Sequence, residues 1–119
     1  MRLCVCGGRD YFNRNKVYEV LDYAFEHKEF VLITGGSTGA DTLAAQWARD
    51  NGVLHELYPA DWKTHGKAAG PIRNRKMAES GIDVLIAFPG GKGTADMIRQ
   101  CKKRKIKVVE VEDENCDIG

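Results

Sequence analysis

Three glycine-rich loops carry the spacing that most directly suggests binding chemistry in this chain. Each follows a short apolar run, and they lie at Gly7–Gly8, Gly35–Gly39 and Gly90–Gly93. Glycine lets the backbone turn sharply and approach a ligand closely, while the first turn of a following helix presents unpaired N–H groups that attract phosphate or carboxylate. Because α/β proteins also need glycine turns for structural reasons, the loops indicate a ligand pocket only together with the charged residues near them.

Two aspartates are candidate catalytic or binding carboxylates. Asp10 follows the first glycine loop, and Asp41 follows the second. Within Thr38-Gly-Ala-Asp41, the aspartate fits a capping box, in which an acidic side chain bonds back to the N-cap N–H. Thr94 and Asp96 suggest a cap of the later helix in the same way. Alternatively, the Asp41 carboxylate faces the pocket, where it would bind a ribose hydroxyl or act as a general base.

A cluster of cations stands near the start of an expected helix, which Pro71 opens at its first position. Arg73 lies in the first turns of this helix, together with Arg75 and Lys76. The positive end of the helix dipole disfavours a cation there by about 0.3–1 kcal/mol, and an anionic ligand would remove this conflict. We therefore expect Arg73 to bind a phosphate through its guanidinium fork, unless an acidic neighbour such as Glu79 holds it.

The segment 59–70 is expected to be a long functional loop, because it is rich in aromatic and charged side chains rather than in glycine and serine. Trp62 either stacks on a base or anchors the loop, and Lys67 adds a cation. His65 has no second histidine or cysteine nearby, so we do not expect it to bind a metal. Lys92 is a further phosphate candidate, although the P-loop pattern is absent, which disfavours a kinase or ATPase.

The candidate ligand-binding residues come from these loops and from the helix that follows segment 59–70. They are Gly7, Gly8, Arg9, Gly35, Gly36, Ser37, Gly39, Asp41, Trp62, Lys67, Arg73, Asn74, Gly90, Gly91, Lys92, Gly93 and Thr94. We expect no metal ligand among them and no bound cofactor.

Apolar runs alternate with amphipathic helical patterns along the chain. The expected strands lie at 2–6, 30–34, 53–58, 84–88 and 108–111, and the expected helices run from the N-cap Asn13 through Phe25, over 40–51, from 71 to about 80, and over 94–105. This alternation predicts a single α/β domain over residues 1–112, Rossmann-like, with three layers and a five-stranded parallel sheet, followed by an acidic tail, 113–119. Right-handed crossovers favour the strand order 3-2-1-4-5, which places the glycine loops at the carboxyl ends of the strands beside the switch point.

Composition and charge restrict the class of protein further. The chain of 119 residues has a formal net charge of +1 and 43% hydrophobic residues, which is ordinary for a soluble globular protein. The near-zero charge disfavours nucleic acid as a partner, and no apolar run approaches the roughly 18 residues that span a membrane. The four cysteines have no metal or redox spacing, so we expect reduced thiols and a cytoplasmic location. The basic run 99–107 is expected to be a solvated helix face.

Longer motifs resemble one family. They are Cys-Gly-Gly-Arg-Asp-Tyr11, Gly-Gly-Ser-Thr-Gly-Ala-Asp-Thr-Leu-Ala44 and the stretch 60–77, and the Pro89-Gly-Gly-Lys-Gly-Thr94 loop continues the match. Together they are similar to the YspA/YpsA-related branch of the SLOG superfamily, which includes small bacterial and phage proteins. The resemblance spans residues 3–111 and implies a Rossmann-like fold that binds nucleotides or nucleotide-derived ligands.

Sister groups of the superfamily suggest other activities. LOG-type phosphoribohydrolases carry Pro-Gly-Gly-x-Gly-Thr-x-x-Glu, but Met97 stands at the Glu position here, and a thioether cannot act as a base or stabilise an oxocarbenium ion. Asp96 is adjacent, yet one residue turns a helical side chain by about 100°, which makes it a poor substitute. The DprA group binds single-stranded DNA, which few stacking aromatics and near-neutral charge disfavour here. LOG proteins pair through helices, and an apolar stripe of Ala95, Ile98 and Cys101 therefore suggests a homodimer.

Two hypotheses remain open at this point. In the first, the protein binds a nucleotide or nucleotide-like phosphate ester, as a sensor or sequestering module. In the second, it hydrolyses an N-glycosidic bond of such a ligand, with Asp41 or Asp10 as the carboxylate; the methionine at position 97 argues against this second hypothesis.

Overall fold

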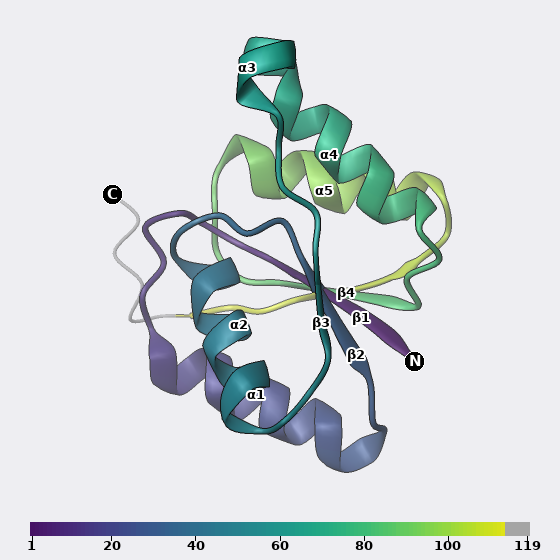
Figure 1. Cartoon of the computed structure of the whole chain (residues 1–119). Coiled ribbons are helices and arrows are strands. Elements are labelled where there is room, and N and C mark those ends of the chain that lie inside the picture. The colour runs from purple at the N-terminus through teal and green to yellow at the C-terminus, as the bar shows by residue number, and fades with distance from the viewer. Residues whose placement is uncertain (114–119) are drawn as a thin grey trace.

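A central parallel sheet organises the computed structural model, which describes residues 1–113 (Figure 1). Its strands pair in the order β3-β2-β1-β4-β5, and every neighbouring pair is parallel. They are β1 (Arg2–Cys6), β2 (Val31–Thr34), β3 (His55–Leu57), β4 (Val84–Ala87) and β5 (Lys107–Glu110). The predicted order is confirmed, as is the edge position of the third strand. From β1 the sheet extends to β2 and β3 on one side and to β4 and β5 on the other, so the switch point lies between β1 and β4.

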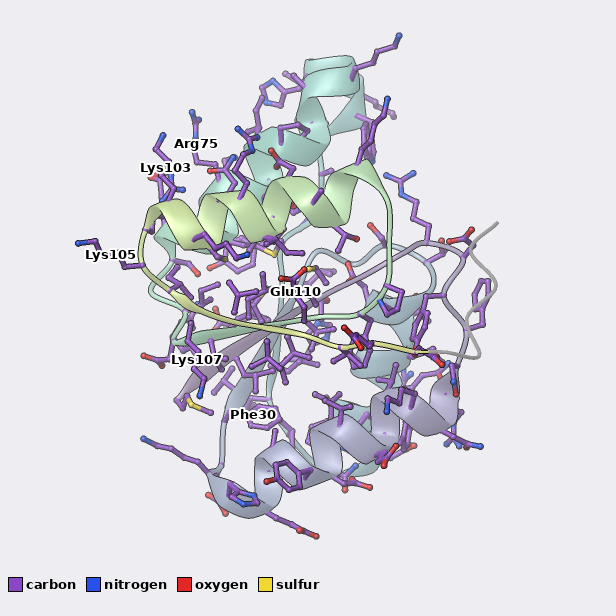
Figure 2. The ribbon with its side chains drawn as sticks, turned by 180° about the vertical axis from the view of Figure 1, so that it is seen from behind. Phe30, Arg75, Lys103, Lys105, Lys107 and Glu110 are labelled. Carbon is purple, nitrogen blue, oxygen red and sulfur yellow. The ribbon has the colours of Figure 1, made fainter. Side chains whose placement is uncertain are left out.

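Two helices cover each face of the sheet. α1 (Arg14–His27) and α2 (Ala40–Asp50) pack on one face, while α4 (Ala69–Glu79) and α5 (Lys92–Lys103) pack on the other. Figure 2, viewed from behind, shows α4 and α5 on one side of the sheet and α1 on the other. This is the predicted three-layer α/β architecture.

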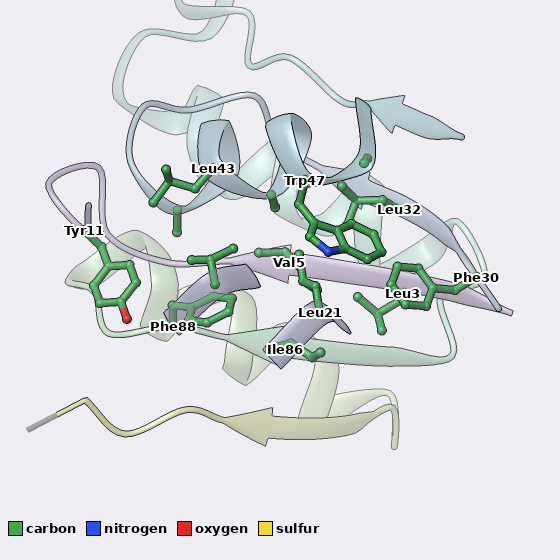
Figure 3. Close-up of a cluster of buried hydrophobic side chains, with 14 residues drawn as sticks. Leu3, Val5, Tyr11, Leu21, Phe30, Leu32, Leu43, Trp47, Ile86 and Phe88 are labelled. Carbon is green, nitrogen blue, oxygen red and sulfur yellow. The ribbon is translucent and has the colours of Figure 1, made fainter. Parts of the chain in front are cut away.

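The larger core lies between the sheet and the α1–α2 layer (Figure 3). At one end of it, the buried ring of Trp47 stacks on Phe30 with ring centroids 5.5 Å apart, and the indole N–H donates to Asp22 at 2.8 Å. At the other end, Tyr11 stacks on Phe88 with centroids 5.6 Å apart. Since these two residues flank the loops after β1 and β4, the core itself positions two of the glycine loops.

The second core lies between the sheet and the α4–α5 layer. Met97 and Cys101 of α5 are fully buried in it, and Ile98 packs against it. The apolar stripe that suggested a homodimer is therefore used inside the molecule, since only Ala95 of that stripe is exposed. The spacing of Met97 and Cys101, four residues apart, sets the inward face of α5.

Cys4, Cys6 and Cys101 are buried free thiols. Burial raises the pKa of each, and it raises the pKa of Cys101 to about 11. These three thiols are therefore protonated at neutral pH and unreactive as nucleophiles. Cys116 lies outside the described residues, as does the acidic tail beyond Asp113.

The expectation of a loop over 59–70 is wrong. A single helical turn, α3 (Trp62–His65), is followed by a 3-10 turn, η1 (Gly66–Ala68), which runs directly into α4. Asp61 caps α3, since its carboxylate accepts the N–H of Thr64 at 3.2 Å. Pro71 is the third residue of α4 rather than the first, which costs nothing because the first four helical N–H groups have no intrahelical partner.

Two predicted caps are also absent. Gly39 is the N-cap of α2, and Thr38 instead donates its hydroxyl to the carbonyl of Arg9 at 3.1 Å. Gly91 is the N-cap of α5, which begins at Lys92, two residues before the expected start. Neither helix has a side-chain cap, because a glycine occupies the position that a serine, threonine or aspartate would need to fill. The predicted cap of α1 by Asn13 is confirmed, since its carboxamide accepts the N–H of Lys16 at 3.1 Å.

Five of the six basic side chains in the run 99–107 are exposed, but the expected helix face covers only part of the run, because α5 ends at Lys103 and Lys107 belongs to β5. Figure 2 shows Lys103 and Lys105 projecting outward at the end of α5, and Lys102 pairs with Glu110 at 3.5 Å. No helix within residues 1–113 is long and apolar enough to cross a membrane.

Candidate functional site

A cavity of about 480 Å³ opens where β1, β2 and β4 end. Most of the residues predicted from the sequence line it. They are Gly7, Gly8, Arg9, Ser37, Asp41, Trp62, Lys67, Arg73, Asn74, Gly91, Lys92, Gly93 and Thr94, together with the second candidate carboxylate, Asp10. The topology thus brings together segments that lie up to 90 positions apart in the chain, from Cys6 to Asp96.

A second cavity of about 270 Å³ adjoins the first and shares with it Arg9, Ser37, Trp62 and Arg73. Gly35 and Gly36 line this second cavity rather than the first. The two cavities lie side by side, because four residues belong to the walls of both.

Gly39 and Gly90 line neither cavity, although the sequence placed them in the site. A Cβ atom on Gly39 would overlap the carbonyl oxygen of Gly8, and one on Gly90 would overlap the hydroxyl of Thr94. Gly39 also has a φ of +76°, which favours glycine. These two glycines therefore allow the loops to pack against one another.

The backbone of Gly8 links the loops. Its N–H donates to the carbonyl of Pro89 at 2.8 Å, and its own carbonyl accepts the N–H groups of Ala40 at 3.1 Å and Tyr11 at 3.2 Å. The loops after β1, β2 and β4 are thereby joined through one residue. They form a connected floor beneath the larger cavity.

Arg73 reaches from α4 to the loop after β2. Its Nη1 donates to the carbonyl of Gly35 at 2.8 Å and its Nε donates to Oδ1 of Asn74 at 3.0 Å. Burial lowers the pKa of Arg73, an effect that the nearby carboxylate of Asp41 opposes. Arg73 is the fifth residue of α4, so the expected conflict with the first turn does not exist, and Glu79 pairs with Arg75 instead.

Asn74 is buried and holds the third loop. Its amide donates to the carbonyl of Gly93 at 3.2 Å and to Asp96 at 3.0 Å. Arg73 and Asn74 thus tie the loops after β2 and β4 to α4, and they give the guanidinium a fixed direction at the cavity wall.

Asp41 is 6% exposed and lines the larger cavity. One carboxylate oxygen, Oδ2, accepts the N–H of Ser37 at 3.1 Å, whereas none of the described residues donates to the buried Oδ1. Burial raises the pKa of Asp41 to about 6, although the Ser37 N–H and the charge of Arg73 act in the opposite direction. A buried carboxylate with an unpaired oxygen is costly, and such groups are enriched at functional sites.

The sequence led us to expect that the side chain of Asp96 is turned away from the position of the LOG-type glutamate, but it is Asp96 and not Met97 that reaches the site. Met97, at the position of the LOG-type glutamate, is fully buried against the sheet, whereas Asp96 lines the larger cavity. The 100° step between neighbouring helical residues explains both positions, since the apolar face of α5 must turn inward. The carboxylate of Asp96 already has protein partners, because it accepts a hydrogen bond from the side-chain amide of Asn74 and forms an ion pair with Arg99.

Sequence reasoning missed five residues that line the larger cavity: Cys6, Gly70, Pro71, Met77 and Asp96. A signal for two of them was present, because Gly70, Arg73, Asn74 and Met77 follow the i, i+3, i+4, i+7 spacing of one helix face. Having treated 59–70 as a loop, we did not extend the α4 pattern back to Gly70. Among residues 1–113, no group of histidine, cysteine and acidic side chains has the arrangement of a metal site.

Comparisons with known proteins agree with this architecture. The structure resembles that of TM1055, with a TM-score of 0.71 and 19% sequence identity over 90% of this chain and 71% of that one. It also resembles the C-terminal domain of the PF1911 hydrogenase from Pyrococcus furiosus, with a TM-score of 0.58 and 14% identity over 92% of this chain and 90% of that one. At these identities the likeness concerns the fold.

Sequence comparison identifies the family. The chain is 37% identical to the Gene 61 protein of Mycobacterium phage D29 over 121 aligned residues, covering 94% of this chain and 97% of the phage protein. The profile of the YspA, cpYpsA-related SLOG family matches residues 1–65, the half of the chain that contains the loops after β1 and β2. The protein belongs to the YspA, cpYpsA-related SLOG family.

Proposed function

We propose that the protein binds a nucleotide or nucleotide-derived phosphate ligand in the larger cavity, as a sensor or sequestering module. The observation that carries this proposal is the fixed guanidinium of Arg73, which two hydrogen bonds hold at the junction of the glycine loops. A guanidinium has five N–H donors, so Arg73 retains donors for a phosphate after making both bonds. A fixed cation binds an anion with little loss of side-chain freedom.

The charges of the cavity support an anionic ligand. Arg9, Lys67 and Lys92 line it together with Arg73. Three carboxylates oppose them, Asp10, Asp41 and Asp96, and of these Asp96 is already paired with Arg99. The four cations therefore outnumber the carboxylates at the cavity wall.

The backbone supplies further donors for a phosphate. α2 and α5 both begin beside the cavity without a side-chain cap, so the N–H groups of their first turns are not bound by a capping side chain. Helix N-termini of this kind favour anions through these groups and through the helix dipole.

A second candidate function is hydrolysis of the N-glycosidic bond of the bound nucleotide. Asp41 supports it, because an unpaired carboxylate oxygen with a pKa of about 6 suits a general acid or base near neutral pH. Asp10 is the alternative carboxylate, and its side chain is exposed at the cavity. Met97 cannot contribute, since it is buried away from the cavity.

One experiment tests both functions. The protein is titrated calorimetrically with the four nucleoside monophosphates and with ADP-ribose, and the same mixtures are then incubated and assayed for free base. A ligand at a hundredfold excess over its Kd should also stabilise the fold by about 2.7 kcal/mol in a thermal melt. Binding without base release supports the sensor, and base release that disappears in Asp41→Asn supports the hydrolase. If no compound binds or is cleaved, the proposed function is wrong.

A further inference from the structure

The second cavity has an apolar wall that the phosphate-binding function does not require. Leu57, 54% exposed, and Trp62, 48% exposed, are large apolar side chains that line it, with Pro59 and Ala60 between them in the chain. Gly36 approaches this wall so closely that a Cβ atom there would overlap Cδ1 of Leu57. The wall is therefore built by the end of β3 and the start of α3, packed against the β2 loop.

Trp62 is held at the boundary between the two cavities. Its ring lies under the guanidinium of Arg9, with Cζ 5.2 Å from the ring centroid, and a Cβ atom on Gly70 would be 3.5 Å from its Cη2. The Asp61 cap fixes the turn that carries this residue. An indole ring fixed in this way offers a planar apolar surface at low entropic cost.

None of the cations of the larger cavity lies on the apolar wall, and two of them lie at the junction of the cavities. Arg9 and Arg73 belong to both cavities, whereas Lys67, Lys92 and the three carboxylates line only the larger one. A ligand that occupies both cavities therefore needs a flat apolar part and an anionic part, separated by a short polar connection. A nucleotide has these properties, with its base and its phosphate at opposite ends of the sugar.

From this arrangement we propose that the second cavity is the base site. A planar heteroaromatic base lies against Leu57 and Trp62, the sugar lies at the junction of the two cavities, and the phosphate lies on the side of Arg73 that faces the larger cavity. The unpaired Oδ1 of Asp41 accepts a sugar hydroxyl that points into the larger cavity. This inference rests on the proposed function and adds which part of the ligand is recognised apart from its phosphate.

The test compares ligands with and without a base. Each nucleoside monophosphate of the panel and ribose 5-phosphate are titrated calorimetrically, and at least one nucleotide should bind roughly tenfold more tightly than ribose 5-phosphate, near the low end of a base–aromatic stack. That nucleotide should also quench the fluorescence of Trp62, whereas Trp47 is fully buried in the core and gives a constant background.

Two leucine variants supply the matched control. Leu57→Ser should reduce nucleotide affinity and leave that of ribose 5-phosphate unchanged. Leu54→Ser should alter neither, because Leu54 is 76% exposed and lines neither cavity. Equal affinities for a nucleotide and ribose 5-phosphate, or a Leu57→Ser variant that binds nucleotides as the wild type does, would overturn the base site and leave the phosphate site intact. If no probe binds at all, the proposed function fails and the base site with it.

Discussion

At the scale of single residues, Asp41 has the most unusual environment in the site. The sequence suggested that it stabilises the start of α2 as part of a capping box, whereas its carboxylate binds the N–H of Ser37 and leaves one oxygen unpaired. A residue that seemed to stabilise a helix therefore lowers the stability of the fold at neutral pH, because its charged form is buried.

This reversal predicts how Asp41→Asn changes stability with pH. The folded pKa of about 6 exceeds the ordinary value of 3.8, so wild-type stability falls as the pH rises from about 4 to above 6. This difference between the two pKa values corresponds to a loss of at most about 3 kcal/mol in the free energy of unfolding. Asparagine keeps an acceptor for Ser37 without the charge, so the variant should be more stable than the wild type at pH 8, and the gain should vanish below pH 4. Urea melts at several pH values measure this difference. Asp10→Asn, at an exposed position, is the control and should remain within about 0.5 kcal/mol of the wild type throughout.

Arg73 predicts a different result from the one its sequence position suggested. Removing a cation from the first turn of a helix would not lower the stability of the fold. The guanidinium of Arg73, however, donates to the carbonyl of Gly35 and to the side chain of Asn74. Arg73→Lys should therefore lower the unfolding free energy by about 1–2 kcal/mol and weaken nucleotide binding, since lysine lacks the planar fork. Arg75→Lys, in the same helix, changes only a surface pair at 3.5 Å and should cost under about 1 kcal/mol. Equal melting temperatures for the two variants would show that the hydrogen bonds of Arg73 do not stabilise the fold.

At the scale of elements, the two ends of α5 offer a comparison. Lys92 begins the helix and lines the larger cavity, whereas Lys103 ends it and projects away from the sheet (Figure 2). Lys92→Ala should weaken nucleotide binding by about 0.5–1.5 kcal/mol, and less so at high salt, where an exposed charge is screened. Lys103→Ala should have no effect. Calorimetric titrations at two salt concentrations measure both, and an equal loss in the two variants would indicate a general charge effect instead.

The elements also show which parts of the structure the sequence can predict. α1 and its Asn13 cap could be predicted because a long amphipathic pattern and a side-chain cap both depend on residues close together in the sequence. α3 and η1 were missed because a helix of one turn has no measurable period. The start of α5 was misplaced, and Thr38 was taken as the cap of α2, because the glycine N-caps of these helices leave no side chain to recognise.

At the scale of the whole molecule, the strand order was predictable, since right-handed crossovers leave few alternatives for alternating strands and helices. That order alone brings the glycine loops to one edge of the sheet, which is why most candidate residues line a common cavity. The second cavity was not predictable. It depends on Leu57 and Trp62 remaining exposed side by side at the ends of two different elements, and no local pattern in the sequence records exposure.

The bonds through Gly8 have a consequence for the speed of binding. Since this residue joins the loops after β1, β2 and β4, the floor of the cavity is already assembled and needs no closing motion. A nucleotide should therefore associate in a single exponential phase, with an observed rate that rises linearly with ligand concentration and is limited by encounter. Stopped-flow quenching of Trp62 fluorescence would record it. A rate that levels off at high ligand concentration would reveal a rearrangement after encounter and would contradict a preassembled floor.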